Sequence, residues 1–393
     1  MIIAYIDRAN LSVAVALPEF KKQFNLTDTQ RGLLTSSFFW SYALLQIPAG
    51  FLVDRYGVKF PYAIAFLFWS MMSAATSFVS AAWQIVTLRI LLGIGESLVT
   101  PASMRWIRFN VAERQRGLAV GIYMAGTKYG PALGVPMATV LVKYYGWQQM
   151  FLILGAGSLL WLIPWMTMVR NDDKQLEAAA LVRSGKPAMA FSQVWKTPLI
   201  YGVIIGTFAY NYFVYFCMTW LPAYFREHRG FSLEKMSSYT FFSFAGMATV
   251  AILAGYAADK LIDFGWDPLR VRKGFTIAGL VVASAELFGT MTSSPETAAY
   301  ISIVSLSGLG LATANYWALT QLLIPGAAAG RIAGVQNFAS NAAGAVAPVL
   351  TGYLIDVTGS YDAPMKAIWI FLLAGIAAYV FLVQQKYAPK AQA

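Results

Sequence analysis

Charged residues, cysteine and histidine are scarce in this chain of 393 residues. Charged residues make up only 12% of it, whereas hydrophobic residues make up 58%, which is unlike the mixture found in a soluble domain. The single cysteine, Cys217, excludes an intramolecular disulfide, and the single histidine, His228, excludes a histidine-rich metal site. The sequence contains no P-loop and no His-Glu-x-x-His pattern. These absences argue against ATP-driven transport by this chain alone and against an intramembrane enzyme, which would need a nucleophile paired with a base.

Long apolar runs dominate what is present. Twelve segments are about long enough to cross a bilayer, which takes roughly 20 residues. Because backbone polar groups in lipid must be satisfied within each segment, we predict an all-α membrane protein of twelve transmembrane helices. The segments are 1–18, 31–53, 60–79, 83–104, 117–142, 149–169, 197–224, 235–257, 274–292, 297–324, 331–354 and 365–385.

One long polar stretch, 170–196, interrupts the middle of the chain and separates six segments from six. We therefore predict a six-helix bundle over 1–169, a cytoplasmic linker over 170–196 and a second six-helix bundle over 197–393. The halves also repeat, because Gly117 and Gly330, like Gly121 and Gly334, are 213 residues apart. Two pseudo-symmetric six-helix bundles are the architecture of a transporter whose halves rock about a central site.

The net charge of +11 would suggest a nucleic-acid partner in a soluble protein. Here most lysines and arginines lie in the loops on one side of the predicted membrane, so the positive charge predicts topology instead: both termini face the cytoplasm. Only six residues precede Asp7, too few to reach the membrane surface from the bilayer middle, and we expect the natural protein to begin upstream of Met1.

Two pairs of charged residues inside apolar segments stand out. Asp7 and Arg8 are adjacent, and they could either neutralise each other or line an aqueous cavity. Arg89 and Glu96 are seven residues apart, on one helix face but too distant to bond directly. A charge at the bilayer centre costs about 2.5–3.5 kcal/mol on insertion scales, so such residues indicate function. We predict a coupled site for a proton and an anion, with a purely structural network as the alternative.

The stretch "GFLVDRYGVK" resembles the loop signature of the major facilitator superfamily. Within that superfamily, four other stretches resemble the anion:cation symporters and occur in the correct order: "YIDRANLSVA", "FFWSYALLQIPAG", "LRILLGIGE" and "FCMTWLPAYF". The resemblance extends over the whole chain. It implies twelve helices in two bundles and import of a small organic anion, such as a sugar acid, in symport with protons. It implies the bacterial inner membrane, lipid contacts and no cofactor beyond the proton gradient. We expect a monomer, and an uncoupled facilitator or exchanger is the alternative.

The resemblance also assigns roles to single residues. Asp7 and Glu96 match the protonatable acids, and Arg89 matches the arginine that pairs with them. Because Arg89 is two turns from Glu96, we expect the charge of Glu96 to be only partly compensated, whereas Asp7 has Arg8 beside it. We therefore expect Glu96 to take up a proton more readily than Asp7 and to be the acid linked to substrate. Arg8 matches the arginine that binds the substrate carboxylate, for which a guanidinium fork is suited.

Four further residues match the walls of the family's sugar-acid pocket: Tyr5, Tyr42, Trp317 and Asn337. Without the resemblance, the three aromatic residues would be read as packing or interface residues.

Three positions depart from the family pattern. Sugar-acid carriers tend to have glutamine where this chain has Thr127 and Thr207, and Lys128 is an additional cation. Lys128 could bind substrate, snorkel to the surface or pair with Glu96. Asn211 lies in an aromatic-rich part of the seventh segment and is a further candidate substrate contact. A substrate with a second anionic group, or an aromatic acid, is therefore as plausible as galactonate.

The loop after the second segment carries the superfamily's signature, and a shorter version follows the eighth segment. We predict that these residues latch the two bundles in one state, with Asp54 meeting basic residues between the fourth and fifth segments. A simple tight turn is the alternative. The residues concerned are Gly50, Asp54, Arg55, Gly57, Lys59 and Asp259.

Overall fold

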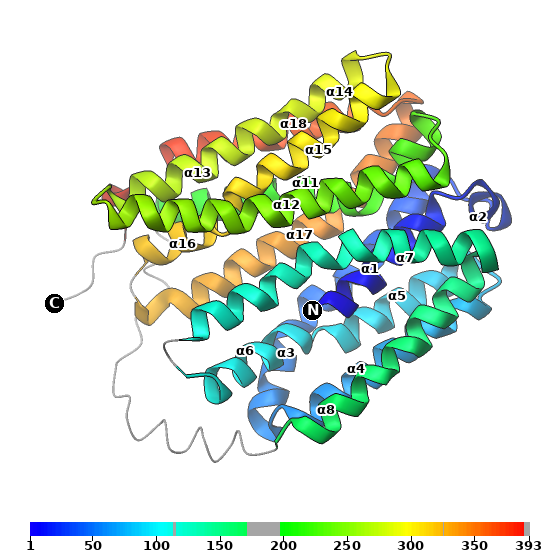
Figure 1. The fold of residues 1–393 in the computed structure, drawn as a ribbon, viewed down its shortest axis with the longest axis horizontal. Helices are drawn as coiled ribbons and strands as arrows, with labels where there is room; N and C mark the ends of the chain where they lie inside the picture. Colours follow the sequence, from blue (N-terminus) through cyan, green and yellow to red (C-terminus); the bar gives the residue numbers. More distant parts are fainter. Residues whose placement is uncertain (113–114, 171–196, 325, 389–393) are drawn as a thin grey trace. The chain divides into compact units, whose positions relative to one another are not determined.

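The structure is a computed structural model that describes residues 1–112, 115–170, 197–324 and 326–388, with the backbone alone at 117 and 326–331. Every regular element in these residues is helical (Figure 1). The chain divides between Gly185 and Lys186 into two compact units. Apart from Arg170, the predicted linker 170–196 lies outside the described residues.

The first unit consists of helices of very different lengths. In chain order they are α1 (Ile2–Val15), α2 (Pro18–Gln23), α3 (Asp28–Tyr56), α4 (Lys59–Ala75), α5 (Ala82–Glu96), α6 (Val99–Asn110), α7 (Arg116–Ser158) and α8 (Leu162–Met168). Short 3₁₀ turns, η1 (Thr76–Phe78) and η3 (Leu159–Trp161), follow α4 and α7.

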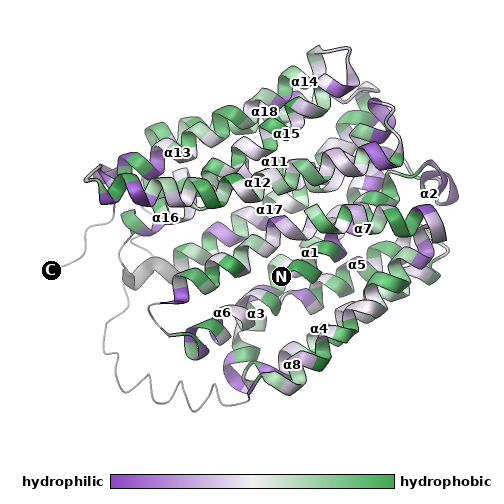
Figure 2. Cartoon of the chain, viewed as in Figure 1, coloured by the Kyte–Doolittle hydropathy of each residue, from purple (hydrophilic) through white to green (hydrophobic). Residues whose placement is uncertain are grey.

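The second unit begins with α11 (Pro198–Ala223), which passes into a π turn, η4 (Tyr224–His228). It continues with α12 (Leu233–Asp263), α13 (Pro268–Ala283), the 3₁₀ turn η5 (Ser284–Leu287), α14 (Phe288–Met291), α15 (Pro295–Thr313), α16 (Asn315–Leu323), α17 (Gly326–Thr358), α18 (Asp362–Phe381) and η6 (Gln385–Tyr387). In both units apolar residues run along the helices, and hydrophilic residues gather at helix ends and in α2 (Figure 2).

The prediction of twelve helical segments is confirmed, although the described residues contain nine stretches that are long and apolar enough to cross a membrane. One stretch, Leu118–Met168, covers two predicted segments, because α7 continues through a bend at Gly146. The helices of two other predicted segments, α1 with 14 residues and α4 with 17, fall below the 18 residues needed for that count.

Local sequence signals set several helix ends. Thr27 and Gln30 form a capping box that starts α3, in which each side chain bonds the other residue's backbone amide. Gly57, with a φ of 81°, ends α3, and Gly146, with the same φ, bends α7. Both angles lie in the left-handed region that favours glycine, so these two positions reverse the chain with little or no loop.

A glycine seam on α7 positions α1, which carries two of the predicted charged residues. Gly126, Gly130 and Gly134 recur every fourth residue and face Met1–Ile2, Tyr5 and Ile6. A Cβ atom at Gly130 would collide with the Cβ of Tyr5, and one at Gly134 would lie 3.0 Å from the Cα of Ile6. Such small residues let two membrane helices approach at backbone distance, which fixes the rotation of α1 about its axis.

Candidate functional site

Arg8 and Glu96 form a buried ion pair between α1 and α5. The Nε and Nη2 atoms of Arg8 donate to the same carboxylate oxygen, Glu96 Oε2, over 2.9 and 2.8 Å. Arg8 is 7% exposed and Glu96 is fully buried. The second oxygen, Glu96 Oε1, has no hydrogen-bond partner among the described residues. One edge of the guanidinium is therefore already occupied by a carboxylate.

Three aromatic rings surround the same guanidinium. The carbon Cζ of Arg8 lies 4.5 Å from the ring centre of Tyr5, 4.4 Å from that of Phe38 and 4.6 Å from that of Tyr42. Ring faces attract a cation, most strongly when both are out of water. The arrangement places the predicted pocket residues Tyr5 and Tyr42 directly on the predicted anion-binding arginine, and Phe38 is an addition that sequence reasoning missed.

Close packing of α3 on α5 holds these rings beside Glu96. A Cβ atom at Gly93 would collide with the backbone oxygen of Phe38 and the hydroxyl of Ser41. Ser41 Oγ donates to the backbone oxygen of Ile90 on α5 over 2.7 Å. Gly93 lies three residues before Glu96. This contact therefore fixes the position of the Phe38 and Tyr42 rings along α5, next to the Glu96 carboxylate.

Asp7 occupies a separate buried pocket of polar groups. Ser73 Oγ on α4 donates to Asp7 Oδ1 over 2.8 Å, and Asp7 Oδ2 has no hydrogen-bond partner in the described part of the chain. Arg89 donates to the backbone oxygen of Asp7 and to Oδ1 of Asn10, both over 3.0 Å. Arg89 thus holds the backbone of α1, and sequence reasoning identified neither Ser73 nor Asn10.

The expected distribution of charge is wrong in two respects. We expected Arg8 to compensate Asp7 and Glu96 to be the less compensated acid, but Arg8 pairs with Glu96. Successive helix positions point about 100° apart, and the α1–α7 seam turns Arg8 toward α5 and Asp7 toward α4. Arg89 was expected to pair with the acids, yet among the described residues it forms no ion pair with either carboxylate.

Lys128 lies on α7 between two glycines of the seam, Gly126 and Gly130, and is 9% exposed. The alternative in which it pairs with Glu96 does not occur in the described residues, since Glu96 is paired with Arg8. A substrate contact by Lys128 stays a prediction.

The polar candidates of the second unit are distributed over α11, α16 and α17. Asn211 Nδ2 donates to the backbone oxygen of Thr207, one turn earlier on α11. Trp317 and Asn337 are both half-buried. Gln336, which sequence reasoning missed, is 1% exposed, and its amide nitrogen donates to Thr320 Oγ1 over 3.0 Å and to Thr207 Oγ1 over 3.4 Å. The amide of Gln336 therefore contacts Thr207, the position at which sugar-acid carriers tend to have glutamine.

The signature loop of the first unit contains an ion pair between two helices. Arg105 Nη1 on α6 donates to Asp54 Oδ1 on α3 over 2.8 Å. Arg105 lies where the predicted loop between the fourth and fifth segments begins, so the expected kind of partner for Asp54 is present. Gly50 and Arg55 lie on α3 near its end, Gly57 ends that helix and Lys59 begins α4. Their role as a latch stays a prediction.

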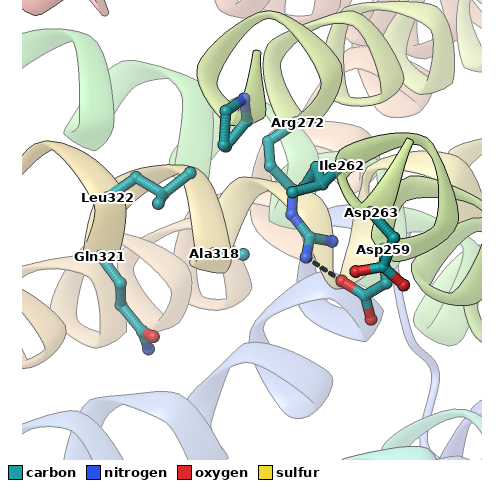
Figure 3. A pocket seen from close by; sticks show the side chains of 8 residues that line it. Asp259, Ile262, Asp263, Arg272, Ala318, Gln321 and Leu322 are labelled. Carbon is teal, nitrogen blue, oxygen red and sulfur yellow. Dashed lines mark hydrogen bonds and ion pairs between the residues drawn. The ribbon is translucent and has the colours of Figure 1, made fainter. Parts of the chain in front are cut away.

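The second unit pairs its corresponding acid differently. Asp259 on α12 accepts from Arg272 on α13, and Arg272 also donates to Asn315 Oδ1 over 2.9 Å. A cavity of about 420 Å³ opens beside this pair, between the ends of α12, α13 and α16 (Figure 3). The repeat of 213 residues places Ala318, which lines the cavity, where the first unit has Arg105. The cavity thus lies where the first unit has a long basic side chain and the second unit has alanine.

Comparisons with known proteins cover most or all of the chain. The model of the Major Facilitator Superfamily matches residues 1–348. The chain is 31% identical to the probable sulfoacetate transporter SauU of Cupriavidus necator, covering 97% of this chain and 90% of that protein. It is 30% identical to the hexuronate transporter of Bacillus subtilis (95% and 88%) and 28% identical to the D-galactonate transporter of Escherichia coli (98% and 93%). The crystal structure of a bacterial homologue of the human lysosomal transporter Spinster matches with a TM-score of 0.81 at 18% identity, over 100% of this chain and 96% of that one.

Proposed function

Because this chain belongs to the Major Facilitator Superfamily, we propose that it imports a small organic anion in symport with protons by alternating access. The family and the relatives compared above are transporters, and the chain is accordingly a multi-pass integral membrane protein and not an enzyme. We further propose a monomer in the bacterial inner membrane with both termini in the cytoplasm.

The observation that carries this proposal is the occupied edge of Arg8. A substrate carboxylate would bind a guanidinium through the same N–H groups that now donate to Glu96 Oε2. Substrate and the ionised Glu96 therefore compete for Arg8. A proton on Glu96 removes the competing charge, so proton uptake and anion binding favour each other. This competition is a physical basis for symport.

Asp7 supplies a second protonatable group at the other side of α1. Its only hydrogen-bond donor among the described residues is Ser73, and no basic side chain there forms an ion pair with it. Ionisation leaves a buried carboxylate with little compensation, which is costly in a low-dielectric site. We propose that Asp7 carries a coupling proton, and that Arg89 keeps the backbone of α1 in place when the charge on Asp7 changes.

The substrate class follows from the relatives and from the cations of the first unit. The relatives are named for sulfoacetate, hexuronate and D-galactonate, which are small organic anions. Sulfoacetate carries two anionic groups, and this chain has Arg8 and an additional buried cation, Lys128. We propose that Arg8 binds the carboxylate and that Lys128 favours substrates with a second acidic group. We propose Tyr5 and Tyr42 as further substrate contacts of the first unit, and Asn211, Trp317 and Asn337 as substrate contacts of the second unit.

The alternative is an uncoupled facilitator or an exchanger, and uptake into proteoliposomes separates the two. The purified full chain is reconstituted, and uptake of radiolabelled sulfoacetate, hexuronate and galactonate is measured with and without an inward pH gradient. Symport predicts accumulation above the external concentration, and a protonophore abolishes it. Equilibration that is indifferent to the protonophore would refute proton coupling, and uptake equal to that of empty liposomes for every anion would refute this substrate class.

A further inference from the structure

Glu286 is a third buried acid, and the mechanism proposed above does not use it. It lies in the second unit on η5, the 3₁₀ turn that separates α13 from α14, and is 2% exposed. A stretch of 3₁₀ helix within a longer helix often marks a hinge. Burying a carboxyl group inside a membrane helix is costly, so its retention there needs an explanation.

The surroundings of Glu286 suit a neutral acid better than a carboxylate. Ser302 Oγ on α15 donates to Glu286 Oε1 over 2.7 Å, whereas Oε2 has no hydrogen-bond partner among the described residues. Its other neighbours include Cys217, Tyr224 and Ser305, which are buried and uncharged, and the charged residue Arg229. No ion pair compensates a negative charge there in the described part of the chain, and an isolated buried carboxylate holds a proton instead.

Arg229 is the charged residue whose field reaches Glu286, and its nitrogen atoms are bonded elsewhere. Its Nε donates to the hydroxyl of Tyr224 over 2.9 Å, and its Nη1 donates to the backbone oxygen of Thr292 over 2.9 Å. Its Nη2 donates to the backbone oxygen of Gly289. Arg229 thereby ties the π turn after α11 to the C-terminal end of α14, where backbone oxygens lack helical partners.

We propose that Glu286 is a proton-binding site of the second unit and that its ionisation draws Arg229 away from the end of α14. With the proton bound, Arg229 holds α14 against the π turn. When the proton leaves, the buried carboxylate and Arg229 attract each other, and the two carbonyl contacts are exchanged for an ion pair. The tie between α11 and α14 therefore depends on proton binding at a site separate from Asp7 and Glu96. This inference requires no substrate.

Infrared spectroscopy tests the bound proton directly. Asp7, Glu96 and Glu286 are the acids that are buried in the described residues, so a chain with Asp7→Asn and Glu96→Gln retains Glu286 alone. At neutral pH that protein should show the carbonyl stretch of a protonated carboxylic acid, and adding Glu286→Gln should remove it. Absence of the band in the double variant, or its persistence after Glu286→Gln, would overturn the assignment.

Cys217 provides a second test in a chain that is otherwise unchanged. It is the single cysteine, it is 1% exposed, and it lies on α11, the helix that passes into the π turn next to Arg229. Its labelling by a maleimide reports opening of the tie. Because the thiolate fraction itself rises with pH, the relevant quantity is the ratio of labelling rates in the parent and in Glu286→Gln. Glutamine keeps an acceptor for Ser302 and imitates the protonated acid.

The ratio should rise with pH by up to about tenfold per pH unit, the limit for release of one proton. Glu296→Gln is the matched control, because Glu296 belongs to the same unit but is exposed and pairs with Lys235 at 3.2 Å. That variant should label like the parent at every pH. A parent-to-Glu286→Gln ratio that does not change with pH would overturn the proposal.

Discussion

Replacing Glu96 with glutamine isolates the competition for Arg8. The parent protein must give up the Arg8–Glu96 contact before an anion binds at alkaline pH, where Glu96 is ionised. Both residues are buried, and two N–H groups donate to one oxygen. A hydrogen bond to a charged group contributes about 1.5–3 kcal/mol, which corresponds to roughly 10- to 150-fold in affinity. The variant should bind the anion tighter than the parent by about that factor at alkaline pH, and equally at acidic pH.

Two measurements examine this prediction. Calorimetric titration of the purified protein with sulfoacetate or galactonate over a range of pH gives the affinities. Proteoliposomes then distinguish exchange from accumulation: the variant should exchange labelled for unlabelled substrate but should not concentrate it under a pH gradient. Glu296→Gln again serves as the control, since Glu296 is exposed and lies in the second unit, far from Glu96 in the sequence. An unchanged pH dependence of affinity, together with normal accumulation, would refute the reasoning.

Three further predictions concern Arg8, the glycine seam and the signature loop. Arg8→Lys keeps the charge but loses the two parallel N–H donors of the guanidinium, so the binding free energy of the anion, measured by thermal shift, should weaken by about 1–3 kcal/mol. Unchanged affinity would show that another cation binds the substrate carboxylate. Gly130→Ala should lower the unfolding free energy by about 1–3 kcal/mol, because the added Cβ collides with Tyr5. Gly121→Ala on the same helix is the control, since a Cβ there meets no atom within 4 Å and should not lower it. Equal melting temperatures of the two variants would contradict the role of the glycine seam. Asp54→Asn should change the free energy of unfolding by less than about 1 kcal/mol, because the Asp54 side chain is 65% exposed. If the loop acts as a latch, the same variant should take up substrate more slowly. Unchanged uptake would mean that Asp54 only forms a surface ion pair.

The helical segments could be predicted because lipid requires long apolar runs, and a charge within such a run is conspicuous. Asp7, Arg8 and Glu96 were found for that reason. Their partners could not be predicted, because they depend on how each helix is rotated about its axis. The α1–α7 seam turns Arg8 toward Glu96, and nothing within the sequence "AYIDRANL" specifies that rotation.

Glu286 and Gln336 were missed for different reasons. Glu286 stands alone in the apolar run of the ninth segment, and the rule that identified Asp7 would have found it. Gln336 gives no such signal, because an amide beside Asn337 becomes notable only when α11 and α16 bring Thr207 and Thr320 to it. The part of the site that could not be predicted from the sequence is therefore the set of contacts between helices that are far apart along the chain.

The bend at Gly146 has a consequence for how the protein enters the membrane. Leu118–Met168 is a helical stretch of 51 residues in which the six residues between the fifth and sixth segments, 143–148, form no separate loop, and the backbone leaves the helical conformation only at Gly146. As the chain leaves the ribosome, the insertion machinery therefore meets one apolar stretch long enough for two crossings. We expect the two segments to enter the bilayer together as a helical hairpin that folds at Gly146.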